Sequence, residues 1–284
     1  MWMLLVLLYG VLKGVREVVK KKALTKNTVM EVLFFYTLLA FLFVVPDAKN
    51  AMGMEPKYYF YVALKSSVIF LAWIFSFKAI DKMPISIYGI LDLSRVLFAT
   101  LLGVFVLQEV LGVYQMIGLI LVSAGLILLK FRPGTARNRQ KEDIQVVYVL
   151  FAFASCILNA VSGLMDKLLM REISSSQLQF WYMLFLVIYY SLYILIKREK
   201  ISFSILKNGW MWGMAVMFVI GDKALFIANG MEGSRITIMT IVKQFGCIIT
   251  IFGGKIFFNE KNTSYRLFCA LVIIMGILFG ILFS

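Results

Sequence analysis

Ten long apolar runs, separated by short polar connections, dominate this sequence. A helix that crosses a hydrocarbon layer of about 30 Å needs roughly 20 apolar residues, which is the typical length of these runs. The sequence therefore predicts an all-α membrane protein with ten transmembrane helices. The predicted helices cover residues 3–19, 28–45, 58–77, 85–107, 111–129, 144–164, 178–196, 210–227, 236–258 and 267–283.

The composition indicates the same class. Hydrophobic residues make up 62% of the 284 residues, charged residues make up 15%, and the mean hydropathy is +0.90. A net charge of +14 would suggest a nucleic-acid partner in a soluble protein, but most of these Lys and Arg residues lie in the connections. We therefore expect contacts with the lipid bilayer and a small-molecule substrate, and no nucleic acid. Lys20, Lys21 and Lys22 follow the first run instead of preceding it, which favours a membrane helix over a signal peptide.

The sequence lacks the usual residues of catalysis and metal binding. It contains no histidine, and Cys156, Cys247 and Cys269 lie inside apolar runs without CxxC spacing. Neither a nucleophile elbow nor a phosphate-binding loop is present. We therefore predict no catalytic site, no metal site and no cofactor, and we do not expect an enzyme.

An internal repeat with an offset of 151 residues divides the chain. The offset aligns Glu109 with Glu260, Tyr114 with Tyr265, Gly103 with Gly254, Gly125 with Gly276 and Ile85 with Ile236. An offset of 149 aligns Gly14 and Glu17 with Gly163 and Asp166. The predicted parts are a first repeat at 1–130, a basic connection at 131–143 and a second repeat at 144–284. Since five helices form each repeat, the second must enter the membrane in the opposite direction, which makes a 5+5 inverted-topology repeat.

Short motifs recur at matching places in the two halves. The fourth and ninth segments end in Leu107-Gln108-Glu109 and Phe258-Asn259-Glu260, and glycines follow in the next segments. Residues 14–24 (GVREVVKKKAL) and 163–169 (GLMDKLL) end the first segment of each half. With these motifs the chain resembles the EamA-like transporters of the drug/metabolite transporter superfamily over nearly its whole length. Gln108 and Asn259 depart from the family pattern, which usually has glycine there.

The resemblance implies secondary transport or exchange of a small polar metabolite, often its export, and leaves the substrate open. It also implies that both termini lie in the cytoplasm. By contrast, Lys and Arg are concentrated in the odd-numbered connections, which the positive-inside rule places in the cytoplasm, with both termini outside. The sequence thus predicts a multi-pass protein of the plasma membrane whose orientation these two arguments leave open.

Charged residues inside apolar runs are the candidate substrate-binding residues, because a charge at the bilayer centre costs about 2.5 to 3.5 kcal/mol unless it has a partner. Asp92 and Arg95 are three residues apart and share a helical face. Lys243 is the repeat counterpart of Asp92. These residues suit a substrate with both charges, or an anion held by Arg95 and Lys243. The alternative for Asp92 and Arg95 is a structural ion pair.

Further candidates lie in neighbouring runs. Lys65 and Asp222 add charge at comparable depth, although Lys65 is also long enough to reach the membrane interface. Trp73 and Tyr88 could hold a cationic or planar substrate against a ring face, whereas most aromatic residues in such a chain serve packing or lipid contact.

Two acidic residues are candidates for gating or proton coupling. Glu17 and its repeat counterpart Asp166 each lie near the end of a helix. The alternative for Glu17 is an interfacial ion pair with Lys13, four residues away. Coupling to a proton could also run through Asp92 or Asp222.

The sequence as a whole predicts a secondary transporter that moves a small polar or charged metabolite by alternating access. Two other classes stay open: a non-transporting scaffold or accessory subunit, and a membrane-embedded enzyme acting on lipid-linked substrates.

Overall fold

The computed structural model describes residues 2–107, 112–130, 145–231 and 242–282, and the regular elements in these ranges are all helices. This confirms the predicted all-α class. The helices are α1 (Trp2–Leu24), α2 (Val29–Val44), η1 (Val45–Asp47), α3 (Ala48–Ala51), α4 (Pro56–Lys82), α5 (Ile85–Asp92), α6 (Arg95–Leu107), α7 (Val113–Lys130), α8 (Val146–Leu169), α9 (Ser175–Lys197), η3 (Phe203–Lys207), α10 (Gly209–Gly230), α12 (Gly246–Phe258) and α13 (Thr263–Leu282).

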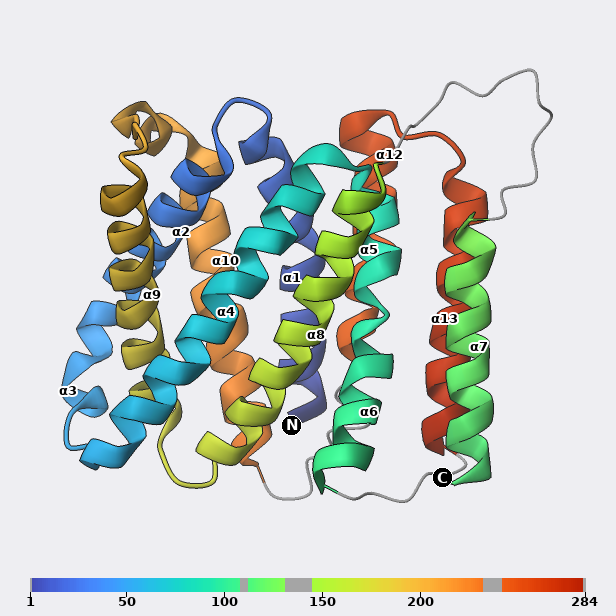
Figure 1. The fold of residues 1–284 in the computed structure, drawn as a ribbon, viewed down its shortest axis with the longest axis horizontal. Coiled ribbons are helices and arrows are strands. Elements are labelled where there is room, and N and C mark those ends of the chain that lie inside the picture. The colour runs from blue at the N-terminus through green and yellow to red at the C-terminus, as the bar shows by residue number, and fades with distance from the viewer. Residues whose placement is uncertain (1, 108–111, 131–144, 232–241, 283–284) are drawn as a thin grey trace.

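Each predicted apolar run contains at least one described helix. Within the described ranges, six helical stretches are both long enough and apolar enough to cross a membrane. The start of α1 and the end of α13 lie at the same edge of the molecule (Figure 1).

The fourth predicted segment is interrupted where the sequence indicated one continuous helix. Leu93 and Ser94 separate α5 from α6, and their amides donate to Ile90 and Leu91, three residues back instead of four. The ninth segment has a similar interruption at Phe245, whose amide donates to Val242. No proline lies at either place, so these turns could not be predicted from the sequence.

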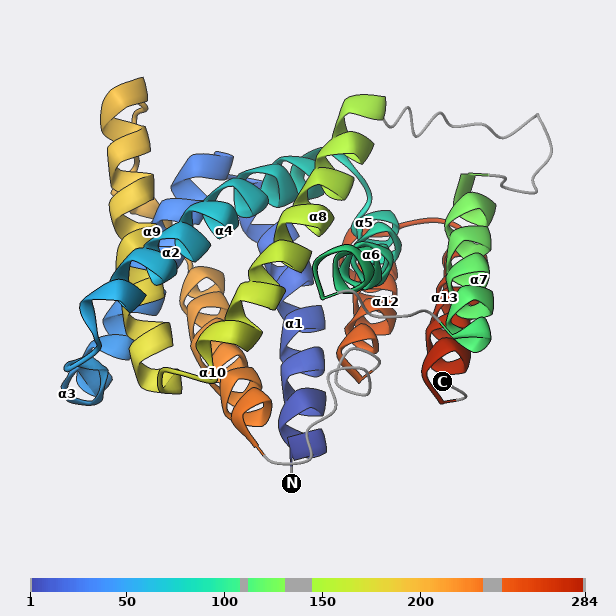
Figure 2. The ribbon, with the colours of Figure 1, turned by 60° about the horizontal axis from the view of Figure 1, so that its bottom comes forward.

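Close helix crossings depend on glycine. A Cβ on Gly14 would lie 2.6 Å from the carbonyl oxygen of Gly246, so α1 and α12 touch backbone to backbone. The pair α7 and α13 stands at one end of the molecule in both views (Figures 1 and 2). There, a Cβ on Gly276 would lie 2.7 Å from the Cβ of Leu121.

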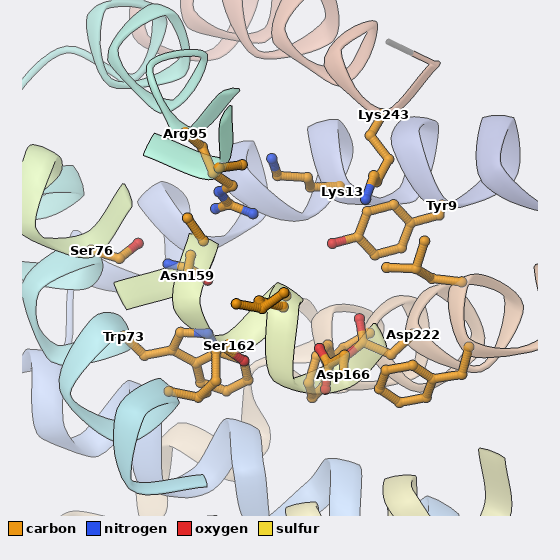
Figure 3. Close-up of a pocket in the computed structure, with 18 of the residues that line it drawn as sticks. Tyr9, Lys13, Trp73, Ser76, Arg95, Asn159, Ser162, Asp166, Asp222 and Lys243 are labelled. Carbon is orange, nitrogen blue, oxygen red and sulfur yellow. The ribbon is translucent and has the colours of Figure 1, made fainter. Parts of the chain in front are cut away.

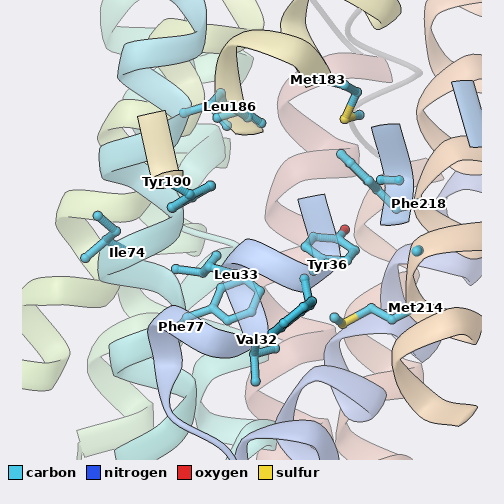
Figure 4. Close-up of a cluster of buried hydrophobic side chains, with 14 of the residues drawn as sticks. Val32, Leu33, Tyr36, Ile74, Phe77, Met183, Leu186, Tyr190, Met214 and Phe218 are labelled. Carbon is cyan, nitrogen blue, oxygen red and sulfur yellow. The ribbon is translucent and has the colours of Figure 1, made fainter. Parts of the chain in front are cut away.

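The main apolar core joins α2, α4, α9 and α10 (Figure 4). Leu33, Phe77 and Met183 are fully buried within it. Tyr36 and Phe218 belong to this core and also line the cavity described below, with ring centroids 5.0 Å apart. The core therefore gives the cavity one rigid side.

Helix ends are fixed by polar side chains. Capping boxes start α2, from Thr28 to Glu31, and α9, from Ser174 to Gln177. Glu260, between α12 and α13, accepts hydrogen bonds from the Ile85 amide at 2.6 Å and the Ser86 amide at 3.2 Å, at the start of α5. Arg266 donates to the same carboxylate at 2.9 Å. Glu109, its predicted counterpart, lies outside the described residues.

Candidate functional site

A cavity of about 280 Å³ lies between α1, α4, α6, α8 and α10 (Figure 3). Its lining extends to Lys167 and Asn229, close to the ends of α8 and α10. These helix ends lie at the same edge of the molecule as the start of α1 (Figure 1).

One side of the cavity carries three cations, Lys13, Arg95 and Lys243, which we call the basic wall (Figure 3). Asp92 lies behind it, where Lys13 Nζ donates to one carboxylate oxygen at 2.5 Å and Arg95 Nη2 donates to the other at 2.8 Å. The Asp92 side chain is 9% exposed. Because one carboxylate serves two cations and lies next to the turn at Leu93, it fixes α1 against both α5 and α6.

The facing side carries Asp166 and Asp222, which we call the acidic wall (Figure 3). Each carboxylate has a basic partner: Lys65 Nζ lies 3.1 Å from Asp166, and Arg16 Nη1 lies 3.7 Å from Asp222. Lys65 is only 2% exposed, so it does not reach an interface. The acidic wall is thus balanced in charge.

Glu17 pairs with Lys20 one turn further along α1, at 2.8 Å. Both side chains are buried, and the Lys20 ammonium lies 4.4 Å from the centroid of the Phe77 ring. Glu17 therefore pairs along its own helix and not with Lys13, which binds Asp92 instead.

Aromatic rings support the charged groups. Lys65 Nζ lies 3.4 Å from the centroid of Tyr182, and the Arg16 guanidinium lies 4.8 Å from that of Phe218. Trp73 packs edge-to-face against Phe218, with ring centroids 5.1 Å apart. The hydroxyl of Tyr88 is 2.7 Å from that of Ser76.

The structure brings nearly all the candidate residues into one place. Arg95, Lys243, Asp222, Lys65, Trp73, Tyr88, Glu17 and Asp166 line the cavity. Asp92 lies immediately behind the lining, in contact with Lys13 and Arg95. The apolar runs of the sequence could not show which helices lie next to one another, because tertiary packing decides that.

Several lining residues were not among the candidates. They include Tyr9, Asn159 and Ser162. Ser162 precedes Asp166 by one helical turn, so its sequence spacing placed it on the same face of α8. Unlike a charged residue inside an apolar run, its uncharged side chain does not indicate a site, because serine occurs widely in membrane helices.

Four buried polar atoms of cavity-lining residues have no hydrogen-bond partner among the described residues. They are Nε of Arg16, Nε of Arg95, the hydroxyl of Ser162, a residue only 1% exposed, and Oδ1 of Asp166. Buried polar atoms are rarely left without a partner, so a partner from solvent or a ligand is expected at these places. Within the described ranges, no group of three or more acidic or cysteine side chains is arranged to hold a metal ion.

The helical fold and the charged cavity define a multi-pass membrane protein. The EamA-like transporter family matches residues 1–131. This match confirms the resemblance that the sequence motifs carried, and it supports a general transporter role.

Comparison with curated proteins gives no match. A solved structure described as "Crystal structure of protein" matches with a TM-score of 0.64 and 15% sequence identity, over 97% of each chain. At this identity the likeness shows the fold alone.

Proposed function

We propose that the protein is a secondary transporter that moves a small polar or charged metabolite across the plasma membrane by alternating access, as an exporter or exchanger. In this proposal residues 1–130 and 144–284 form two five-helix repeats of opposite topology. The cavity between them is the substrate site.

The pattern of helix packing supports this repeat. If the halves are exchanged, α1 corresponds to α8 and α4 corresponds to α10. The helix α1 packs on α10, and α8 packs on α4, as the exchange requires. Likewise α4 packs on α9 while α10 packs on α2, and α7 packs on its own counterpart α13. An in-plane pseudo-twofold axis is the arrangement that lets one chain open to either side.

The interrupted helices are the strongest support for the proposal. The turns at Ser94 and Phe245 differ by the same 151 residues that align the two halves. Discontinuous helices in corresponding places of inverted repeats typically form the binding site of secondary transporters. Here the cavity residues Arg95 and Lys243 lie directly beside these two turns.

The two ion pairs of the acidic wall also join corresponding helices of the two halves. Arg16 on α1 pairs with Asp222 on α10, and Asp166 on α8 pairs with Lys65 on α4. The helices of the first pair, α1 and α10, are the counterparts of α8 and α4 in the second pair. The base lies on α1 in the first pair, whereas the acid lies on its counterpart α8 in the second. We propose that Glu17 and Asp166, equivalent in α1 and α8, act in gating, and that Asp222 or Asp92 is the residue through which a proton could be coupled.

One crossing differs between the halves, which supports two alternating states. Gly14 is pressed against Gly246, whereas a Cβ on its counterpart Gly163 would meet no atom within 4 Å. In the opposite state we expect Gly163 to be in close contact and Gly14 to be free.

Counterflow in proteoliposomes tests the function. Vesicles containing the purified chain are loaded with single amino acids, sugars, carboxylates, phosphate esters or quaternary amines, and uptake of the same labelled compound is measured. We expect uptake of at least one compound above that of empty vesicles, with Lys255→Gln, an exposed position on α12, behaving like the parent chain. Uptake of none would favour a scaffold or accessory subunit.

Two further measurements refine the proposal. Asp222→Asn should remove the dependence of uptake on a proton gradient if that carboxylate carries the proton, and Asp92→Asn should do so if Asp92 does.

Orientation is tested by Asn138→Cys in a chain whose three native cysteines are replaced. We propose that both termini are outside, so position 138 should resist an impermeant thiol reagent in intact cells, and labelling there would place the termini in the cytoplasm.

A further inference from the structure

We propose that the substrate of this cavity is a small organic anion, whose carboxylate or phosphate group binds between Arg95 and Lys243. The inference rests on the proposed transport function and adds the chemical class of the substrate to it.

The first argument is the charge of the basic wall. Within the described ranges, Lys13, Arg95 and Lys243 share the single Asp92 carboxylate, whereas each carboxylate of the acidic wall has its own cation. Among the described residues, no carboxylate forms an ion pair with Lys243 and no group accepts a hydrogen bond from it, and the Asp166 carboxylate faces it across the cavity. Two positive charges are therefore unmatched on one side of a low-dielectric cavity, where an anion would be attracted most strongly.

The second argument is hydrogen bonding. Arg95 uses Nη2 for Asp92, which leaves its Nε as a buried donor without an acceptor. A carboxylate or phosphate oxygen is the acceptor that matches a guanidinium best. The side chains of Arg95 and Lys243 both point toward the space in the middle of the cavity (Figure 3).

The third argument comes from the repeat. The counterparts of Lys13 and Asp92 in the second half are Ser162 and Lys243. Where the first half has a salt bridge at 2.5 Å, the second half has a lysine and a buried serine hydroxyl that lacks a partner. The negative charge that one half supplies from Asp92 is missing in the other, and a bound anion would supply it.

The size of the cavity and the groups on the acidic wall indicate the part of the ligand that lies beyond its anionic group. About 280 Å³ accommodates a compact metabolite, and Ser162 lies on the side of the cavity facing Lys243 (Figure 3). An anion with a second polar group could reach both walls. Asp166 and Asp222 already have cations at 3.1 Å and 3.7 Å, so the charge of this wall is balanced, while Asp166 Oδ1 is left to accept a hydrogen bond from the second polar group of the ligand.

The test is thermal stabilisation of the detergent-solubilised chain by matched four-carbon probes. Succinate is a dianion, 4-aminobutyrate a zwitterion and succinamide neutral. Glycerol 3-phosphate and glycerol form a second pair, and chloride salt equalises ionic strength. We expect succinate or glycerol 3-phosphate to raise Tm by about 2 °C or more at millimolar concentration, with smaller shifts for the zwitterion and neutral analogues.

Lys243→Gln is the decisive variant. It removes no partner of Asp92, so the unliganded protein should keep its Tm, while the apparent affinity for the anion should fall about tenfold or more. Lys255→Gln, an exposed lysine of α12, should keep the affinity. The inference is overturned if no anion raises Tm, if 4-aminobutyrate or succinamide equals succinate, or if Lys243→Gln binds the anion as well as the parent.

Counterflow separates this inference from the function on which it rests. An anion that binds through Lys243 but is not exchanged in proteoliposomes supports the anion site and contradicts transport. Exchange of an amino acid, sugar or amine without anion binding supports transport and contradicts the anion site.

Discussion

Lys13 and Asp92, 79 residues apart in the chain, form a 2.5 Å salt bridge that attaches α1 to the last residue of α5. Arg95 binds the same carboxylate from the first residue of α6. The side chain of Asp92 thus spans the interruption of the fourth segment, where main-chain hydrogen bonding of the α-helical kind is broken.

Asp92→Asn should destabilise the protein by about 2 kcal/mol, because it leaves two cations of the basic wall without a counter-charge. The loss is measured as a fall in Tm of the detergent-solubilised chain. Glu55→Gln is the matched control, since the pair of Glu55 with Lys57 is 65% and 59% exposed and should contribute little. Equal effects of the two substitutions would contradict the bridging role of Asp92.

Glu260→Gln should lower the free energy of unfolding by about 1 to 3 kcal/mol. The carboxylate accepts from two amides at the start of α5 and pairs with Arg266, and a neutral amide loses both the charge and an acceptor oxygen. Glu199→Gln, at an exposed position after α9, serves as the control in the same melting experiment. A Tm unchanged from the parent would show that α5 does not depend on this cap.

The equivalent glycines Gly14 and Gly163 should respond oppositely to alanine. Gly14→Ala places a methyl group 2.6 Å from the Gly246 carbonyl oxygen and should lower Tm. Gly163→Ala meets no atom within 4 Å, and it should raise stability by up to about 1 kcal/mol through helix propensity.

The larger change Gly163→Leu extends this prediction to transport. It should not disturb helix packing in the state described here, where a Cβ at Gly163 meets no atom within 4 Å, yet it should slow counterflow, because the opposite state brings Gly163 into close contact and because Gly163 also lines the cavity. Counterflow at the rate of the parent chain would argue against that alternating crossing.

The pair Lys65 and Asp166 should be strongly coupled. Lys65→Met or Asp166→Asn alone leaves one buried charge without its partner and should cost about 3 kcal/mol, whereas the double variant should cost less than the two single losses combined. Tm values for the four proteins form a double-mutant cycle. Additive losses would mean that the 3.1 Å contact contributes little to stability.

The sequence predicted most helices because each apolar run is locally recognisable. It also identified the buried charges of the cavity, since Asp92, Asp166 and Asp222 stand out within apolar surroundings. It failed at the turn of Leu93 and Ser94, because hydrogen bonding to residues three positions back leaves no proline or other marker there. Ser162 was missed for a related reason: its position becomes informative only when the opposite wall is known.

Length and hydrophobicity along the chain determined the all-α membrane class by themselves, because the bilayer requires every spanning segment to satisfy its own backbone hydrogen bonds. The choice of partners was decided by tertiary structure alone. Lys13 lies four residues before Glu17, a spacing that allows a pair on one helical face, yet it binds Asp92 on another helix, while Glu17 binds Lys20. Which charges neutralise one another, and which remain for a ligand, depends on distances between helices that only their packing sets.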